Sequence, residues 1–166
     1  MQEIIIRDAT RDDLPAILAI YNHAVLHTTA IWNETVSDLK GRETWWRDRT
    51  DNSLPVFVVD VNGTSAGFAT YGPFRPNHGY KHTRELSIYV DERFRRRGLA
   101  TRLLKALETH ARANHVHVLV GGIEAKNSAS IDLHLKHGFS ETARMKEVGR
   151  KFDRWLDLIL MQKILT

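Results

Sequence analysis

The chain has 166 residues, enough for one domain with a sizeable core, and we expect a single domain over residues 1–166. A formal net charge of +4 permits an anionic small molecule but is too mild for a dedicated nucleic-acid binder. The sequence has no cysteine, which excludes disulfides, thiolate metal sites and cysteine nucleophiles. It also has neither a signal-peptide pattern nor an apolar run of membrane-spanning length. We therefore expect a cytoplasmic protein with no membrane partner.

The first half of the sequence predicts a strand, two helices and a hairpin. Thr10 and Asp13 form a capping-box pattern, which marks the start of the first helix. Asn62-Gly63 lies between two apolar runs and is a strong signal for a β-hairpin. In chain order we expect a strand at 4–6, a helix at 10–25, a loop at 27–36, a helix from 37 or 38 to about 49, and strands at 56–61 and 66–71.

The second half alternates strands with helices. In the strand after a Gly- and Pro-rich loop at 72–82, apolar residues at 86, 88 and 90 alternate with residues of the other face at 85, 87 and 89. The sequence then predicts a basic turn at 93–97, a helix from 98 to 111, a strand at 116–123, a helix at 127–137, and strands at 141–148 and 154–164. This order predicts a mixed α/β sheet with helices on its faces.

The turn at 95–101 carries the clearest chemical signal. Gly98 and the small Ala100 allow a ligand to approach the backbone closely. The first amides of the following helix and the helix dipole favour an anion, and three arginines stand beside them. These features suit a pyrophosphate. From the residues alone, a solvated basic turn is an equally good interpretation.

Arg95-x-x-Gly98-x-Ala100 at a strand-to-helix turn resembles the acetyl-CoA pyrophosphate loop of the GNAT superfamily of N-acetyltransferases. Asn127, in a helix that ends in His137-Gly138-Phe139, resembles that superfamily's second cofactor motif. Segments at 29–34, 69–72, 82–90, 127–134 and 155–158 further resemble the phosphinothricin and methionine sulfoximine N-acetyltransferases. The resemblance implies a three-layer GNAT-like fold: a mixed, mostly antiparallel, twisted sheet of about seven strands with helices on both faces and a splayed cofactor cleft.

The resemblance also implies that acetyl-CoA is the co-substrate and that no metal takes part. The pantetheine arm would pair with the backbone of the strand at 88–90, where one amide would polarise the thioester carbonyl. From the residues alone, a helix cap at Asn127 and a solvated lysine at Lys136 are the favoured interpretations, whereas the resemblance gives both a cofactor role. The expected cofactor-binding residues are Ile88, Tyr89, Val90, Arg95, Arg96, Arg97, Gly98, Leu99, Ala100, Thr101, Asn127 and Lys136.

The implied reaction is direct acetyl transfer to an amine in a ternary complex. We expect Glu85 to act as the base, directly or through water; the alternative is a surface ion pair with Arg84 or Lys81. His134 stands where many members of the superfamily have a tyrosine, and we expect it to protonate the departing thiolate. A packed helix residue is the alternative. His134 and His137 are three residues apart, but without a third ligand they do not predict a metal.

The implied acceptor is a small amino acid analogue such as L-methionine sulfoximine, methionine sulfone or L-phosphinothricin, with resistance to such compounds as the role. Arg75 offers a bidentate partner to a carboxylate and a donor to a polar side-chain head. Trp32 either walls the pocket or packs in the core. The expected substrate-binding residues are Trp32, Arg75, Pro76, Asn77, Glu85, Leu86 and Ser87.

Other interpretations stay open at this point. The same chemistry suits another amine acceptor, such as an ordinary amino acid, a polyamine or a peptide N-terminus. A non-catalytic acyl-CoA sensor would keep the fold without the reaction. The subfamily resemblance implies a homodimer, and the single basic cluster gives no reason to expect nucleic acid as a partner.

Overall fold

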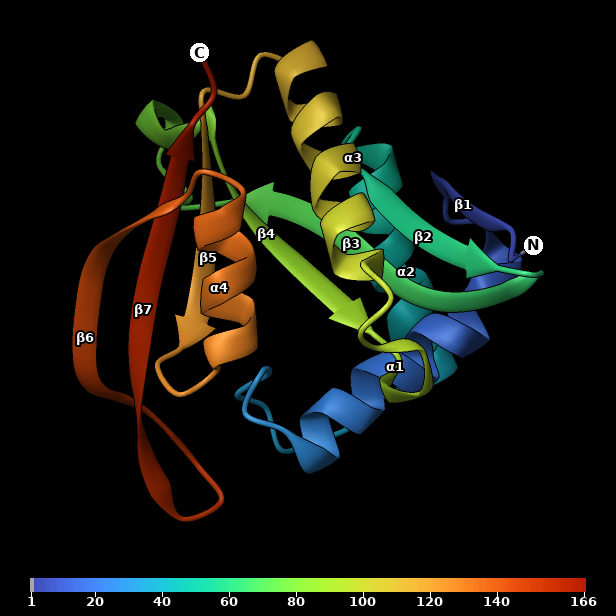
Figure 1. Ribbon diagram of the computed structural model, residues 1–166, viewed down its shortest axis with the longest axis horizontal. Helices are drawn as coiled ribbons and strands as arrows, with labels where there is room; N and C mark the ends of the chain where they lie inside the picture. Colours follow the sequence, from blue (N-terminus) through green and yellow to red (C-terminus); the bar gives the residue numbers. More distant parts are fainter. Residues whose placement is uncertain (1) are drawn as a thin grey trace.

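The computed structural model describes residues 2–166, which form one seven-stranded sheet with helices on both faces (Figure 1). Short 3-10 turns lie at Arg11–Asp13, His78–Tyr80 and Glu92–Phe94. The main elements are β1 (Ile4–Asp8), α1 (Leu14–His27), α2 (Leu39–Asp51), β2 (Val56–Val61), β3 (Thr64–Pro73), β4 (Thr83–Val90), α3 (Leu99–Ala113), β5 (Val118–Glu124), α4 (Ser128–Lys136), β6 (Ser140–Lys151) and β7 (Arg154–Ile164).

The strand order is β1-β2-β3-β4-β5-β7-β6, and every neighbouring pair is antiparallel except β4 and β5. A parallel pair needs a crossover, and α3 supplies it between β4 and β5. The predicted α/β fold class, a mixed and mostly antiparallel sheet, is therefore confirmed.

Two buried clusters hold the helices on the two faces of the sheet. On one face α3 buries Leu103, Leu104 and Leu107 completely. On the other, α1 packs Leu14 and Ile17 into a second cluster with residues of β2 and β3. Figure 1 shows α3 and α4 in front of the sheet and α1 behind it. The protein thus has three layers, and the helices leave the middle strands free to position a site.

The observed elements depart from the predicted ones mainly at their ends. The strand predicted at 141–148 runs on to Lys151, because Phe152 and Asp153 make the hairpin turn with φ of 51° and 56°. Turns of this kind usually use Gly, Asn or Asp, so Asp153 alone is a weak signal and Phe152 gives none. Among residues 2–166 no helix is long and apolar enough to cross a membrane.

Asp13 joins the start of α1 to the sheet. Its buried carboxylate accepts hydrogen bonds from both terminal nitrogens of Arg7, at 2.7 and 2.9 Å. It also accepts bonds from the backbone of Thr10, at 2.7 Å, and from the hydroxyl of Ser65, at 2.6 Å. Although burial opposes ionisation, the bonds from Arg7 and Ser65 hold the pKa of Asp13 well below its usual range. The predicted capping box is therefore present and is extended by an ion pair.

Asp13→Asn is expected to lower the free energy of unfolding at pH 7 by about 2 kcal/mol, because the change removes the closer of the two carboxylates that pair with Arg7 and leaves only Asp60, at 3.2 Å. That value lies below the range for fully buried pairs, since the Arg7 side chain is 37% exposed. Because the pKa of Asp13 is lower in the folded protein than in the unfolded chain, its ionised carboxylate stabilises the fold at pH values above the ordinary pKa of an aspartate. The difference from wild type should therefore shrink as the pH falls below about 4. Urea unfolding at several pH values measures it, with the exposed Asp12→Asn as control; a difference independent of pH would contradict the assignment.

Candidate active site

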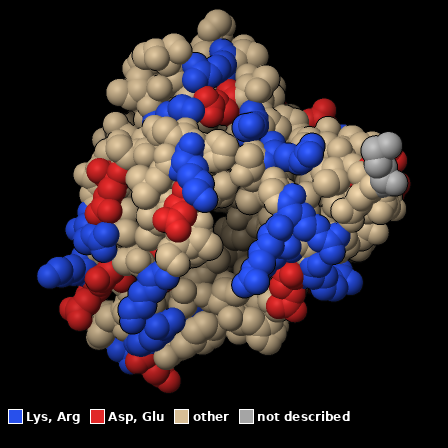
Figure 2. Space-filling model, in the orientation of Figure 1, with Lys and Arg blue, Asp and Glu red and all other residues tan. Residues whose placement is uncertain are grey.

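The cleft of this protein opens where β4 and β5 part. Their parallel pairing joins Thr83–Leu86 to Val118–Gly121 and, among the described residues, goes no further. Beyond that point a cavity of about 1230 Å³ lies between the strands, walled by the start of α3, by α4 and by the end of α1. Figure 2 shows the hollow near the middle of this face, with Lys and Arg side chains on its rim. The parted strands thus create a cleft through the sheet that can hold an extended ligand.

One end of the cleft is suited to an anion. Gly98 has a φ of 71°, a conformation that would be strained for any residue with a side chain. The space beside it is open, and a side chain there would cover the start of the helix. The first helical bond of α3 runs from the Arg102 amide to the Gly98 carbonyl. The amides of Leu99, Ala100 and Thr101 therefore precede that bond and point out of the helix. Arg95 and Arg96 line the same end of the cleft, and Arg97 instead stacks over Phe94 at 5.3 Å.

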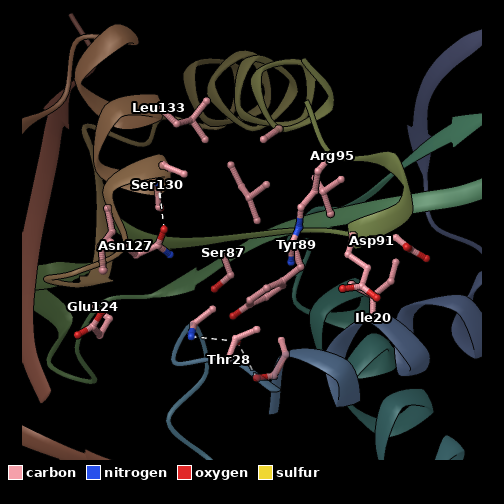
Figure 3. A pocket seen from close by; sticks show the side chains of 18 of the residues that line it. Ile20, Thr28, Ser87, Tyr89, Asp91, Arg95, Glu124, Asn127, Ser130 and Leu133 are labelled. Atoms are coloured by element: carbon pink, nitrogen blue, oxygen red, sulfur yellow. Dashed lines mark hydrogen bonds between the residues drawn. The ribbon is translucent and has the colours of Figure 1, made fainter. Parts of the chain in front are cut away.

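The middle of the cleft is a free strand edge. On one side, β3 pairs with β4 as far as Val90. On the other side, Ser87 to Val90 face the cleft without β5, so their outward amides and carbonyls are available to an extended ligand. Figure 3 shows Ser87 and Tyr89 on this edge, opposite Asn127 and Ser130 of the α4 side. All three of the predicted strand residues, Ile88, Tyr89 and Val90, line the cleft.

Asn127 both caps α4 and faces the cleft. Its side-chain oxygen accepts a hydrogen bond from the Ser130 amide at 3.2 Å, drawn as a dashed line in Figure 3. The cap uses only the oxygen, so the side-chain NH2 keeps two donors for a ligand. The two interpretations of Asn127 are therefore compatible. Lys136, by contrast, is exposed at the far end of α4 and lies in a separate shallow depression beside Lys105 and Glu108.

His134 is buried in α4 and reaches the cleft. Its Nδ1 lies 2.7 Å from the Ser130 carbonyl oxygen, which can only accept, so we assign the proton to Nδ1. Its Nε2 faces Gly121 of β5, and no partner for this buried atom occurs in the described part of the chain. Burial lowers the pKa of His134. A neutral ring of this tautomer offers a lone pair at Nε2, so proton donation from Nε2 requires the imidazolium.

Glu85 lies on the opposite face of the sheet from His134, at the point where the strands begin to part. Its Oε1 crosses toward β5 and lies 3.0 Å from the position of a Cβ on Gly122. Burial raises the pKa of Glu85, and the charge of Arg75 partly offsets this. Glu85 has no ion pair with any described residue, so the predicted alternative, a surface pair with Arg84 or Lys81, is absent from the structure. A half-buried carboxylate with a raised pKa can act as a base.

The predicted acceptor loop lies outside the cleft lining. Arg75, Pro76 and Asn77 are exposed between β3 and β4, and the Arg75 guanidinium stacks 4.6 Å from the Phe74 ring. Leu86 and Ser87 do line the cleft. The loop acts on the site through the charge of Arg75, which lowers the pKa of Glu85. Direct contact of the loop with a bound acceptor stays a prediction.

The loop after α1 is fixed to the β6–β7 hairpin. The ammonium of Lys151, 1% exposed, donates to the carbonyl oxygens of Thr28, at 2.7 Å, and Ile31. The Trp32 ring packs on the backbone of Gly149, and its Nε1 donates to Thr29. Trp32 therefore packs against the hairpin and does not line the cleft, whereas Thr28 to Ala30 do.

Several cleft residues were not expected from the sequence. Glu124 is buried at the end of β5 and accepts a bond from the Lys126 amide at 2.9 Å. Phe152 and Arg154, from the β6–β7 turn, line the same side. A carboxylate that ends an apolar strand is the one sequence signal here, since the others depend on where the hairpin lies. No group of three or more metal-ligating side chains was found in residues 2–166.

Comparison with known proteins gives consistent results. The sequence profile of the acetyltransferase (GNAT) family matches residues 17–139. The L-methionine sulfoximine/L-methionine sulfone acetyltransferase of Pseudomonas aeruginosa is 50% identical over 158 residues, covering 95% of this chain and 92% of that protein. The crystal structure of a ribosomal-protein-alanine N-acetyltransferase from Brucella melitensis is 53% identical, with a TM-score of 0.96 and coverage of 97% and 99%. A phosphinothricin acetyltransferase from Sinorhizobium meliloti, solved with acetyl-CoA, is 32% identical, with a TM-score of 0.94 and coverage of 98% and 88%.

At pH 7 we expect His134 to be neutral and protonated on Nδ1, because Ser130 holds that proton and burial lowers its pKa. Proton–nitrogen correlation spectra of the imidazole rings, recorded from about pH 5 to pH 8, report both the tautomer and the midpoint. A midpoint above the ordinary histidine value of 6.5, or a proton on Nε2 of the neutral ring, would contradict this assignment.

Proposed function

The chain belongs to the GNAT acetyltransferase family and uses acetyl-CoA as co-substrate, and from this premise we propose that its acceptor is a small L-amino acid analogue. The acetyl group would pass to the α-amino group of compounds such as L-methionine sulfoximine, methionine sulfone or L-phosphinothricin. The observation that carries the proposal is Glu85, a half-buried carboxylate beside the opening of the sheet, next to a loop that bears Arg75. Two of the relatives are named for such compounds, methionine sulfoximine or sulfone and phosphinothricin, and both match nearly the whole chain.

Acetyl-CoA fits the cleft by its chemistry. The arginines and helix amides at 95–101 suit the pyrophosphate, and the free edge at 88–90 suits the amides of an extended pantetheine. The side-chain NH2 of Asn127 would donate to the pantetheine from the other wall. In the proposed complex a backbone amide of β4 polarises the thioester carbonyl, where negative charge develops during transfer. Arg97 and Lys136 lie away from this lining, and their proposed contacts would be with the nucleotide end.

Glu85 would prepare the nucleophile. An α-amino group is largely protonated near neutral pH and must lose that proton before its lone pair can attack. A carboxylate whose pKa is raised by burial is a stronger base than an exposed one. The sequence has no cysteine to carry an acetyl group, which agrees with direct transfer between bound co-substrates.

The departing thiolate needs a proton, and two sources are proposed. His134 can supply it from Nε2 only as the imidazolium, a form that burial disfavours. Water in the open cleft is the other source. His134 and Glu85 lie on opposite faces of the sheet. In this proposal Glu85 takes the proton from the amine on one face, and His134 delivers a proton to the sulfur from the other.

The acceptor's polar head would lie toward the loop at 75–77. Sulfoximines, sulfones and phosphinates carry oxygen atoms that accept hydrogen bonds, and Arg75 with the exposed loop amides can donate them. Plain methionine lacks these oxygens, so polar groups that the head would satisfy stay unpaired. Ser87, whose side chain is on the Glu85 face, would complete this end.

A second candidate is a peptide N-terminus, favoured by the name of the Brucella melitensis relative at 53% identity. Polyamines are a weaker candidate, because the cations Arg75 and Lys81 stand on the same exposed loop and would repel a polycation. Both alternatives keep the acetyl transfer and change only the acceptor.

We also propose a homodimer that acts in the cytoplasm in resistance to amino acid analogues. Apolar side chains exposed at the β6–β7 hairpin support the dimer: Val148 is 47% and Trp155 58% exposed. The light-scattering mass of the purified protein tests it.

An acceptor panel tests the proposed function. Purified protein and acetyl-CoA are expected to release free thiol rapidly with L-methionine sulfoximine and L-phosphinothricin, and slowly with L-methionine, since methionine lacks the polar head. The panel also contains spermidine, a peptide with an N-terminal alanine, and a reaction without acceptor. Turnover with spermidine or the peptide alone would replace the proposed acceptor.

Glu85→Gln is expected to lower kcat roughly 100-fold or more, with little change in the KM for acetyl-CoA, because the amide cannot accept the proton. In the wild type, kcat should fall as the pH drops through the pKa of Glu85, which lies above the ordinary value of 4.5. Arg75→Ala should move that acidic limb to higher pH, because the charge of Arg75 lowers this pKa. A pH profile that is the same in wild type and Glu85→Gln would remove Glu85 as the base.

A further inference from the structure

Helix α2 carries two partly buried guanidinium groups. Arg42 and Arg49 are seven residues apart, two turns of helix, and are therefore on one face of it. Trp45 and Trp46 lie between them and pack against the buried cluster around Phe68. Burial lowers the pKa of both arginines, and the charge of Arg42 lowers that of Arg49 further. Two like charges are thus held in a partly desolvated place.

The two arginines differ in how they are satisfied. Arg42 stacks 4.0 Å from the Tyr21 ring, and its Nε donates to the Ser37 hydroxyl at 3.3 Å. Arg49 has only a long bond of 3.4 Å from Nη1 to the Tyr71 carbonyl, and its buried Nε has no partner among the described residues. Neither arginine forms an ion pair within residues 2–166. The adjacent Asp48 raises the pKa of Arg49 but is exposed.

The Arg49 guanidinium lies directly on the backbone of Gly72. A Cβ on Gly72 would collide with Nη1, so only glycine allows this approach. Gly72 is paired with Glu85 across β3 and β4. Residues directly opposite in an antiparallel pair share one face of the sheet. Arg49 and Glu85 therefore lie on the same face and above neighbouring strands, with the Glu85 carboxylate leaning away toward Gly122.

We propose that Arg49 binds the α-carboxylate of the acceptor while Glu85 takes the proton of its ammonium group. The proposal rests on the proposed function, since it assigns the second charged group of the same substrate. A free α-amino acid carries its ammonium group and its carboxylate on one carbon. These two charges are complementary to the carboxylate of Glu85 and the guanidinium of Arg49, which lie above adjacent strands. An incoming carboxylate would give the unpaired guanidinium its missing acceptors in a bidentate geometry. Arg75, exposed on its loop, is then left for the polar head.

This assignment predicts which amines the enzyme rejects. A peptide N-terminus, a polyamine or an amino acid amide has an amine but no α-carboxylate. Each of these acceptors would cover the Arg49 guanidinium without giving it an anion to bind. The cost of this uncompensated charge opposes their binding. The enzyme would therefore be specific for free amino acids, independently of the side-chain head.

The test compares two acceptors that differ only at the carboxyl group: L-methionine sulfone and its carboxamide. For Arg49→Gln we expect kcat/KM for the acid to fall about 10- to 100-fold, the usual range for hydrogen bonds to a charged group. We expect kcat/KM for the carboxamide to change less than about 3-fold, and the KM for acetyl-CoA to stay the same. Arg47→Gln is the matched control, because Arg47 lies on the same helix, exposed and paired with Glu43.

Gly72→Ala gives a second, independent variant. Its Cβ would displace the end of a flexible side chain, so it should move the guanidinium without unfolding the protein, which thermal unfolding checks. It should lower the preference for the acid over the carboxamide in the same direction as Arg49→Gln. Equal losses for acid and carboxamide in both variants, or an unchanged preference, would overturn the proposal. Absence of turnover by the wild type with any free amino acid would overturn the proposed function instead.

Discussion

The parting of β4 and β5 is the constraint on which the rest of the molecule depends. A parallel pair that stops after four residues on each strand leaves half of β4 with an unpaired edge inside the protein. Unpaired backbone groups in such a place need partners, and an extended ligand with amides can supply them. The same parting opens the sheet from one face to the other. In the proposed complex, cofactor and acceptor would therefore meet from opposite faces of the sheet.

Close approach to glycine places three large side chains directly on strand backbone. The His134 ring lies on Gly121, the Arg49 guanidinium on Gly72 and the Trp32 ring on Gly149. None of these three glycines has a positive φ, so their role is to leave room for a neighbour and not to allow an unusual turn. Each puts a bulky group within contact of strand backbone, where a Cβ would hold it away. The groups so placed come from three different segments of the chain.

The parts of the site that depend on local sequence could be predicted, and the parts that depend on docking could not. The turn from Arg95 to Thr101 is read from adjacent residues, and its positive φ at Gly98 follows from the residue type. The face of Glu85 follows from the alternation of one strand. The Arg49–Gly72 contact joins a helix to a strand 23 residues later and depends on how α2 lies on the sheet. The sequence is equally consistent with Trp32 as a pocket wall and as a packed residue, and only the position of β6 places its ring on Gly149.

The bond from Lys151 to the loop after α1 joins residues that are 123 positions apart in the chain. A contact of such separation forms only when β6, near the end of the chain, has reached the sheet. During synthesis from the N-terminus, β1 to β5 and their helices can assemble while this loop has nothing to rest on. The wall at Thr28 to Ala30 thus depends on the last two strands of the chain. A chain that ends before the hairpin would lack both of these bonds and also β7, which pairs with β5, and so would have no finished cleft.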